Sequence, residues 1–222
     1  MSYRRRHLYL LIDTETANSI HCPFCYNIAW CIIDQYGNVY AQGNFINKDV
    51  FFGMIDLMQS AYYADKIPQY LEQIEAGEIT VTSWYEIRKA LCDMCAQYNV
   101  KAIIAHNARF DYRSCTNTQR YETCSKYRYF FPKDVEIWDT LAMARDVIAP
   151  MASYKKFCND NGYVCKNGTP RLTAEILYRF ITNDTDFIEA HKAMEDVEIE
   201  REIFWYCIHK HKKMNRQAFK KK

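Results

Sequence analysis

The chain has 222 residues, of which 49% are hydrophobic and 15% are aromatic, so it can bury a sizeable core. Its 29 Lys and Arg residues nearly balance 27 Asp and Glu residues, and the formal net charge is only +2. The sequence has no run of about 18 apolar residues, and the arginines at 4–6 lead into a short apolar strand instead of a signal-peptide core, so we expect an intracellular, cytoplasmic protein without a membrane partner.

The first predicted element is a strand over residues 8–12, whose unbroken apolar character is typical of a central strand buried on both faces. Asp13 follows this strand. Because strand side chains alternate, Asp13 and Glu15 should point to one side and Thr14 to the other. Two carboxylates on one face suit magnesium or manganese. Taken alone, however, such a pair would be interpreted as acids that cap a strand end.

Two further strands are predicted at residues 26–34 and 38–46, joined by a turn signal around Gly37. With the first strand they should form an antiparallel three-strand meander. Residues 50–78 are predicted to be an added helical insertion, for which surface elaboration and contact with substrate or a partner both stay open. Residues 84–98 are predicted to form the next helix.

A short apolar strand at residues 101–105 leads through residues 106–111 into a predicted helix, with Asp111 near the start of that helix. Ligands bind in the crevice outside the strand ends of an open sheet, so Asp111 can converge with Asp13. An aspartate that caps the helix is the alternative.

Residues 135–138 are predicted to form another strand, followed by a helix over 139–145 that has Asp139 as its N-cap. Asp139 is therefore left out of the metal site, although an acid at a strand end remains a second candidate. Two more helices are predicted, at residues 154–158 with Ser153 as the cap and at residues 173–180.

The last acidic segment contains His191 and Asp196. Five positions correspond to about 140° around a helix, so these two residues cannot share one face if both are helical. We therefore expect His191 to precede the helix and Asp196 to project from its first turns. The residues predicted to face the core are Ala193, Val197, Phe204 and Ile208.

As an ordered set, Asp13 with Glu15, Asp111, and His191 with Asp196 resemble the motifs of the DnaQ-like, DEDDh-type 3′-to-5′ exonucleases. The resemblance extends over residues 8–208. It implies a ribonuclease H-like α/β fold, with a mixed five-stranded sheet (the three-strand antiparallel meander plus two parallel strands) flanked by helices. We expect one exonuclease domain over residues 1–222. The segments 173–180 and 189–200 also resemble stand-alone exonucleases of bacteriophages.

The resemblance also implies roles for individual residues. Asp13, Glu15 and Asp196 would hold one Mg²⁺ or Mn²⁺ ion, Asp13 and Asp111 would hold a second, and His191 would be the general base. Positions beside the terminal nucleotide are occupied by Thr14, Thr16, His106, Asn107 and Phe110. Two such metals stabilise the charge that develops on the attacking and leaving oxygens of a phosphodiester.

The predicted function is therefore hydrolysis of DNA or RNA from a single-stranded 3′ end, releasing nucleoside monophosphates. A nucleic-acid-binding module without turnover is one alternative, and a hydrolase of very short oligonucleotides or nucleotide messengers is another. A polymerase or replication protein would be a separate chain, and the oligomeric state stays open.

Basic residues gather at both ends of the chain, at 4–6 and in a tail at about 210–222. Such ends attract a phosphate backbone but are also ordinary solubilising tails. Residues 120–133 interleave basic and aromatic side chains, which fits either a lip for a single strand or core packing. Ten cysteines should be free thiols, although the pairs Cys22/Cys25 and Cys92/Cys95 have spacings that also occur in zinc sites.

Overall fold

A computed structural model describes residues 6–124, 129–189 and 191–219. Within these residues six strands form one mixed sheet in the order β4-β3-β2-β1-β5-β6. Their bounds are β1 (Leu8–Ala17), β2 (Phe24–Asp34), β3 (Val39–Asn47), β4 (Thr80–Thr82), β5 (Val100–Ala105) and β6 (Glu136–Asp139).

The predicted antiparallel meander is confirmed, because β2 pairs antiparallel with both β1 and β3. The two further predicted strands are parallel, since β5 pairs with β1 and β6 pairs with β5. The prediction of five strands was wrong. β4 pairs parallel with β3 over residues 45–47 and makes a sixth strand. Three residues are too few to carry a period-two pattern, so only the pairing of their backbone with the β3 edge reveals this strand.

β1 also continues five residues beyond the predicted strand end. Its ladder with β2 extends from Leu8 to Ala17, with a register shift between Glu15 and Thr16. The polar side chains after Ile12 interrupt the apolar pattern without interrupting the backbone hydrogen bonds. Asp13 and Glu15 are therefore held inside a strand, where their directions are fixed by the pleat.

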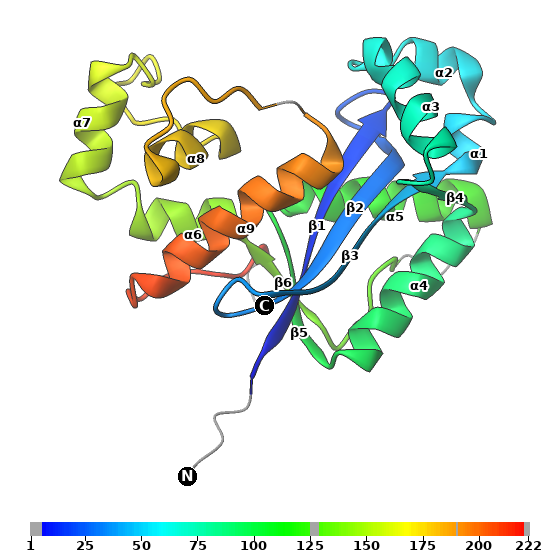
Figure 1. Ribbon diagram of the computed structural model, residues 1–222, viewed down its shortest axis with the longest axis horizontal. Helices are drawn as coiled ribbons and strands as arrows, with labels where there is room; N and C mark the ends of the chain where they lie inside the picture. Colours follow the sequence, from blue (N-terminus) through cyan, green and yellow to red (C-terminus); the bar gives the residue numbers. More distant parts are fainter. Residues whose placement is uncertain (1–5, 125–128, 190, 220–222) are drawn as a thin grey trace.

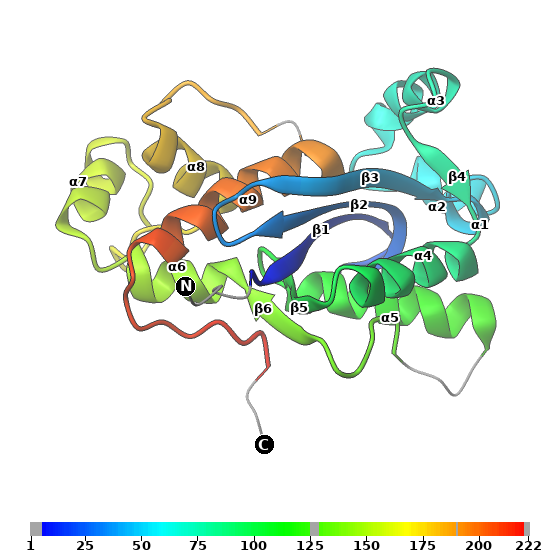
Figure 2. The same cartoon turned by 60° about the horizontal axis from the view of Figure 1, so that its bottom comes forward.

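Helices cover both faces of the sheet (Figures 1 and 2). One face packs against α6 (Thr140–Val147), α7 (Ala152–Asp160), α8 (Ala174–Thr182) and α9 (Ala193–His209). The other packs against α4 (Trp84–Gln97) and α5 (Arg109–Thr123). In β1, Tyr9 and Leu11 enter the first core and Leu10 and Ile12 the second, which is the alternation expected of a central strand.

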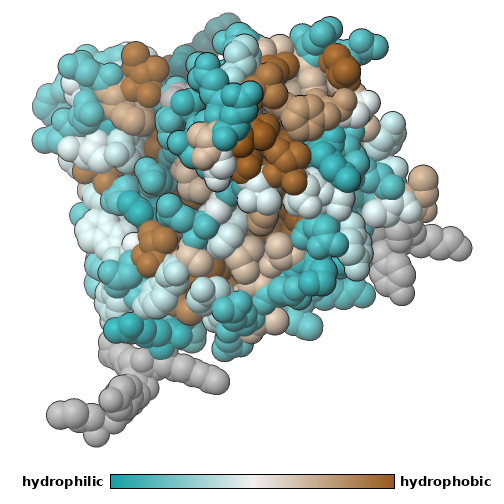
Figure 3. Space-filling model, turned by 45° about the vertical axis from the view of Figure 1, so that its right-hand side comes forward, coloured by the Kyte–Doolittle hydropathy of each residue, from teal (hydrophilic) through white to brown (hydrophobic). Residues whose placement is uncertain are grey.

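The segment predicted as a helical insertion contains α1 (Lys48–Phe51), α2 (Ile55–Gln59), the 3₁₀ turn η1 (Ala64–Lys66) and α3 (Ile67–Glu75). Its buried residues, including Tyr70, pack on Ala17, Tyr26 and Ile46 of the sheet. Figure 3 turns this side of the molecule forward, and apolar surface (brown) gathers in the upper part of that view. Several apolar side chains of the insertion are exposed: Phe52, Ile55, Tyr62 and Leu71.

The predicted helix caps had mixed outcomes. Asp139 is confirmed as the N-cap of α6, because its side chain accepts a hydrogen bond from Leu141 N. The prediction for Ser153 was wrong, since α7 begins at Ala152 after Met151 and has no side-chain cap. A serine inside the first turn and a serine before it look alike in sequence.

Part of the predicted basic C-terminal tail lies along the edge of β6. Gln217 forms an isolated antiparallel bridge with Trp138, and Ala218 N donates to Ile137 O at 3.0 Å. Asp139 N donates to Arg216 O at 2.8 Å. Other basic terminal positions, 4–5 and 220–222, lie outside the described residues. In the described part of the chain, no helix has both the length and the apolar character needed to cross a bilayer.

Candidate active site

Three predicted site residues meet between β1 and the start of α9. Asp13, Glu15 and Asp196 can each offer one carboxylate oxygen such that all three oxygens lie within 4.8 Å of one another. Asp13 and Glu15 point toward α9 because they share the face of β1 that carries Tyr9 and Leu11. Asp196 comes from the first turn of α9. The sheet and the helix thus place carboxylates from distant segments in one cluster.

Asp111 reaches the same region from the other face of the sheet. It is buried in the first turn of α5, and Thr14 Oγ1 donates to Asp111 Oδ1 at 2.8 Å. Thr14 points away from its neighbours Asp13 and Glu15, as the alternation predicts, and so connects β1 to α5. The N-cap of α5 is Ala108, so the alternative that Asp111 caps this helix was wrong.

Two further acids, Glu189 and Glu200, join this cluster, and neither was among the predicted site residues. Glu200 lies one turn after Asp196 on α9 and is buried, and its Oε1 accepts from His106 N at 2.6 Å. Glu189 Oε2 lies 3.8 Å from His191 Nδ1. The spacing of four between Asp196 and Glu200 is the sequence signal that could have found Glu200, because such residues share a helix face.

The arrangement of buried oxygens suits a cation. Within the described residues, Asp196 Oδ1 and Glu200 Oε2 are buried and have no hydrogen-bond partner. Buried polar atoms without a partner are rare and need an explanation such as a bound ion. A cluster made of carboxylates is the ligand set that Mg²⁺ or Mn²⁺ prefers. The residues present therefore fit the divalent cations implied by the sequence.

Burial raises the pKa of every carboxyl group in this cluster. It raises the pKa of Glu15 to about 7, that of Asp111 to about 7 and that of Asp196 to about 8. The pKa values of Asp13 and Glu200 also rise well above their ordinary values, first through burial and then through neighbouring carboxylates. Lys66 opposes the rise at Glu15 and Asp196. Buried carboxylates this close together repel one another unless they are protonated or bind a cation.

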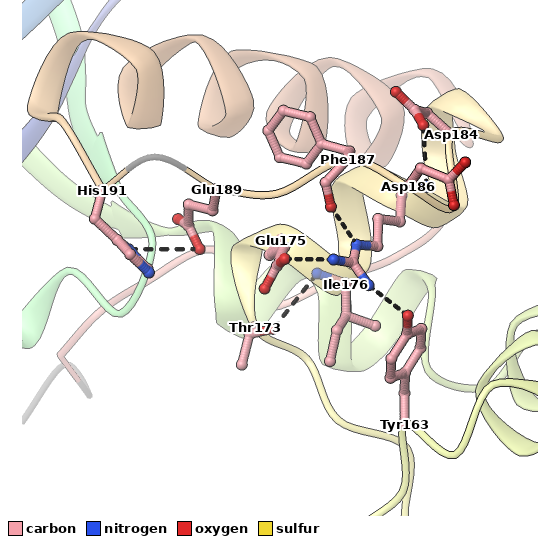
Figure 4. A network of polar contacts seen from close by, with 10 residues as sticks. Tyr163, Thr173, Glu175, Ile176, Asp184, Asp186, Phe187, Glu189 and His191 are labelled. Atoms are coloured by element: carbon pink, nitrogen blue, oxygen red, sulfur yellow. Dashed lines mark hydrogen bonds and ion pairs between the residues drawn. The ribbon is translucent and has the colours of Figure 1, made fainter.

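His191 precedes α9, as predicted, and has a left-handed backbone with φ of 50°. It forms a second possible metal-binding group with Glu189 and Asp196. Figure 4 shows His191 and Glu189 side by side on the segment before α9. The same segment is held by Arg179, whose Nε donates to Phe187 O at 2.6 Å while its Nη2 pairs with Glu175 at 2.6 Å.

The residues predicted to lie beside the terminal nucleotide have different surroundings. His106 Nδ1 lies 2.9 Å from Thr140 Oγ1 and Nε2 lies 2.9 Å from Leu172 O, so both ring nitrogens already have protein partners. Burial lowers the pKa of His106. Asn107 has a left-handed backbone and an exposed side chain, and its N–H donates to Asp139 Oδ1 at 3.0 Å. Thr16 and Phe110 are half-buried.

A cavity of about 860 Å³ adjoins the carboxylate cluster. Acidic residues on its wall are Asp13, Glu189, Asp196 and Glu200, and basic residues on its wall are Arg145 and Arg171. His106 and Asn107 also line it. Acidic side chains and two arginines therefore line the same cavity.

The paired cysteines give no support for a zinc site. Burial raises the pKa of the Cys25 and Cys92 thiols and raises that of Cys95 to about 12, so these thiols are protonated near pH 7. Among the described residues, neither group that could hold a metal contains a cysteine.

The basic and aromatic stretch at 120–133 is divided between core and surface. Phe130 and Phe131 are buried, and Phe130 stacks on Trp84 with ring centroids 4.4 Å apart, as the core-packing alternative predicts. Tyr121 and Tyr129 are exposed. Residues 125–128 of this predicted lip lie outside the described residues.

Known proteins resemble this chain in three-dimensional structure only. No protein-family model matches the chain, and no curated protein matches it. Among solved structures, Escherichia coli exonuclease I in complex with a dA16 oligonucleotide superimposes with a TM-score of 0.52 and 18% identity, covering 88% of this chain and 39% of that chain. A product-bound exonuclease I gives a TM-score of 0.53 and 16% identity, with coverage of 90% and 42%.

A third structure, SSB/exonuclease I in complex with an inhibitor, gives a TM-score of 0.54 and 17% identity, with coverage of 90% and 41%. This chain has the fold of exonuclease I. It spans about two fifths of the length of those exonuclease I chains. The resemblance found in the sequence and the likeness in three dimensions therefore agree at the level of the mixed α/β fold.

Proposed function

We propose that this protein is a metal-dependent 3′-to-5′ exonuclease that hydrolyses phosphodiester bonds from the 3′ end of a single strand and releases nucleoside monophosphates. The observation that carries the proposal is the convergence of Asp13, Glu15 and Asp196 within 4.8 Å, with Asp111 bound to the intervening Thr14. These residues come from three distant segments. A solved exonuclease I of the same fold is in complex with a dA16 oligonucleotide, which supports the substrate class.

The roles follow from the donor set. Asp13, Glu15 and Asp196 would hold one Mg²⁺ or Mn²⁺ ion and Asp13 with Asp111 a second, and such ions supply charge that stabilises the attacking and leaving oxygens. His191 accepts the proton of the attacking water. Glu189 lies beside His191 Nδ1, so we assign proton acceptance to Nε2. Arg145 and Arg171 attract the phosphates of the strand into the cavity.

A histidine suits this step because a neutral imidazole nitrogen can accept a proton from the attacking water. We propose that Thr14, Thr16, His106, Asn107 and Phe110 surround the terminal nucleotide. Thr14 would do so through its backbone, because its side chain donates to Asp111. His106 and Asn107 would do so through the loop they shape, because the His106 ring and the Asn107 N–H are engaged within the protein. A cytoplasmic location, a phage origin and a polymerase partner stay predictions.

The decisive experiment compares wild type, Asp13→Ala and His191→Ala on 5′-labelled single-stranded DNA, duplex DNA and RNA with Mg²⁺ or Mn²⁺. Asp13→Ala should lower turnover about a thousandfold or more, since bound metals contribute several kcal/mol to the transition state. It should also lose divalent-cation binding in calorimetry. His191→Ala should lower turnover by about 10²- to 10⁴-fold while it retains cation binding.

Asp93→Ala is the matched control, because Asp93 is an exposed acid on α4 that pairs with Lys89. This variant should retain full activity and cation binding. A fully active Asp13→Ala protein would contradict the proposed function. Binding of oligonucleotides without any hydrolysis by the wild type would favour the non-catalytic binding module. A length series of oligonucleotides then separates degradation of long strands from activity restricted to very short ones.

A further inference from the structure

His191 is contacted by a segment that lies 125 residues earlier in the chain. Lys66 Nζ donates a hydrogen bond to His191 O at 2.7 Å. The ring of Tyr63 stacks on the His191 imidazole, with centroids 5.1 Å apart and an interplanar angle of 23°. Both contacting residues belong to the insertion between β3 and β4, for which the sequence left the role open. The insertion therefore reaches the imidazole that the proposed function makes the general base.

We propose that Tyr63 and Lys66 are positioning residues for His191, so that the insertion forms one wall of the active site. This inference rests on the proposed function. Tyr63 covers one face of the imidazole and limits rotation of the ring. Lys66 fixes the backbone from which that ring projects. With Glu189 beside Nδ1, the remaining nitrogen, Nε2, is held in a single direction.

The backbone of His191 gives a physical reason why it needs such support. Its φ of 50° lies in the left-handed region, which costs a non-glycine residue free energy unless surrounding contacts compensate. The segment before it is anchored at Phe187 by Arg179, and α9 begins only at Ala193. A charge-assisted hydrogen bond from Lys66 to the His191 carbonyl is the kind of contact that can hold this conformation.

Tyr63 and Lys66 also support each other. Lys66 Nζ lies 4.0 Å from the centroid of the Tyr63 ring, within the range of a cation–π contact. They lie three residues apart around η1, and residues at this spacing are on the same side of a 3₁₀ turn. The two side chains thus present one ordered surface to His191.

Electrostatic interactions place this pair beside the carboxylate cluster. Lys66 acts on Glu15, Asp196 and Glu189, lowering the pKa of each against the effect of burial. Burial and then the Glu15 carboxylate raise the pKa of Tyr63 to about 12, so its phenol stays neutral near pH 7. A neutral ring can cover the imidazole without adding negative charge to the cluster.

The insertion is itself fixed to the sheet, which a positioning element requires. Tyr70 of α3 lies in edge contact with Tyr26 of β2, with centroids 5.7 Å apart, and both are buried. The 3₁₀ turn η1 leads directly into α3. The position of Tyr63 is therefore set through Tyr70 and Tyr26 by β2, the strand that pairs with the part of β1 that carries Asp13.

The test measures kcat and KM for hydrolysis of a single-stranded oligonucleotide by Tyr63→Ala, Tyr63→Phe, Lys66→Met and Lys66→Arg. Tyr63→Ala and Lys66→Met should each lower kcat about 10- to 50-fold with KM changed less than about threefold, because misdirection of the base affects the transition state and not substrate binding. Tyr63→Phe should restore most of the kcat that Tyr63→Ala loses, and Lys66→Arg should restore part of it. Tyr85→Ala, an exposed tyrosine on α4, is the matched control and should not change kcat.

A double-mutant cycle separates positioning from a general structural role. In a His191→Ala background, Tyr63→Ala should cause little further loss of kcat, since it acts through the missing imidazole. An equal loss in both backgrounds, an unchanged kcat in Tyr63→Ala or a selective rise in KM would overturn the proposal.

NMR of the metal-free protein tests the contact between Tyr63 and His191 independently of nuclease activity. The ring current of Tyr63 should displace the His191 imidazole proton resonances, so Tyr63→Leu should shift them in an NMR spectrum assigned with His191→Ala. An absence of any shift would overturn the positioning contact even if the protein is a nuclease. A clear shift together with full activity of His191→Ala would instead overturn the role of His191 in the proposed function, and the catalytic part of this inference with it.

Discussion

Glu200 is a buried acid behind the carboxylates that would hold the metals. One of its oxygens accepts the His106 N–H, and the other is buried without a hydrogen-bond partner in the part of the chain that the structure describes. Asp111 and Asp196 both raise its pKa after the larger effect of burial. This acid can therefore add negative charge to the site when a cation enters.

Replacement of Glu200 by Gln tests that contribution. The amide oxygen can still accept from His106 N–H, so we expect the variant to fold. Its affinity for Mn²⁺ should fall by about tenfold, because one negative charge near the site is removed. Isothermal titration of Mn²⁺ into wild type and variant measures the difference. Equal affinities would mean that Glu200 stays neutral when the metal binds.

At the scale of elements, Asp139 connects three segments at the edge of the site. Its Oδ1 accepts from Leu141 N at 2.9 Å, which caps α6, and from Asn107 N at 3.0 Å, which holds the loop after β5. The residue assigned to a helix cap from the sequence thus also shapes the segment that leads to Asp111.

Asp139→Ala should lower the free energy of unfolding by about 1–2 kcal/mol, since the loss of an N-cap has about this cost and a second N–H also loses its acceptor. Urea unfolding followed by circular dichroism measures the change. Ser153→Ala is a suitable control, because Ser153 is exposed inside the first turn of α7 and is not a cap, and it should change stability by less than about 0.5 kcal/mol. A larger effect of Ser153→Ala than of Asp139→Ala would contradict this assignment.

For the whole molecule, the buried acids link stability to pH. Glu15 and Asp111 have pKa values of about 7 and Asp196 about 8 in the folded chain, against about 4 in an unfolded chain. Between these values the folded state binds more protons than the unfolded state. The contribution of these three groups to the free energy of unfolding of the metal-free protein should therefore be greatest below about pH 4 to 5. It should fall as pH rises toward 8.

Thermal melting of the EDTA-treated protein checks this direction, and Tm should be lower at pH 8 than at pH 5.5 by about 5 °C or more. Addition of Mg²⁺ or Mn²⁺ should raise Tm more at pH 8 than at pH 5.5, because the cation replaces protons in the carboxylate cluster. A divalent cation that raises Tm equally at both pH values, or not at all, would argue against binding at these acids.

Local chemistry made much of this site predictable. The alternation of side chains along a strand separates Asp13 and Glu15 from Thr14, and the 3.6-residue helix period separates His191 from Asp196. The residues themselves therefore indicated which side chains could share a face, and the order of strands and helices followed from apolar patterns and turn signals. The single exonuclease domain over residues 1–222 and the catalytic roles stay predictions.

The sequence by itself determined most of the elements and the directions of side chains within them, because apolar alternation, the helix period and turn signals depend on residues close together in the chain. It also indicated Asp13, Glu15 and Asp196 of the carboxylate cluster, through the order of the acidic motifs along the chain. Only the tertiary structure decided that β4 extends the sheet, that Glu200 joins the cluster and that Tyr63 and Lys66 contact His191. Each of these features is a contact between distant segments, which packing and backbone pairing bring together and which no local periodicity encodes.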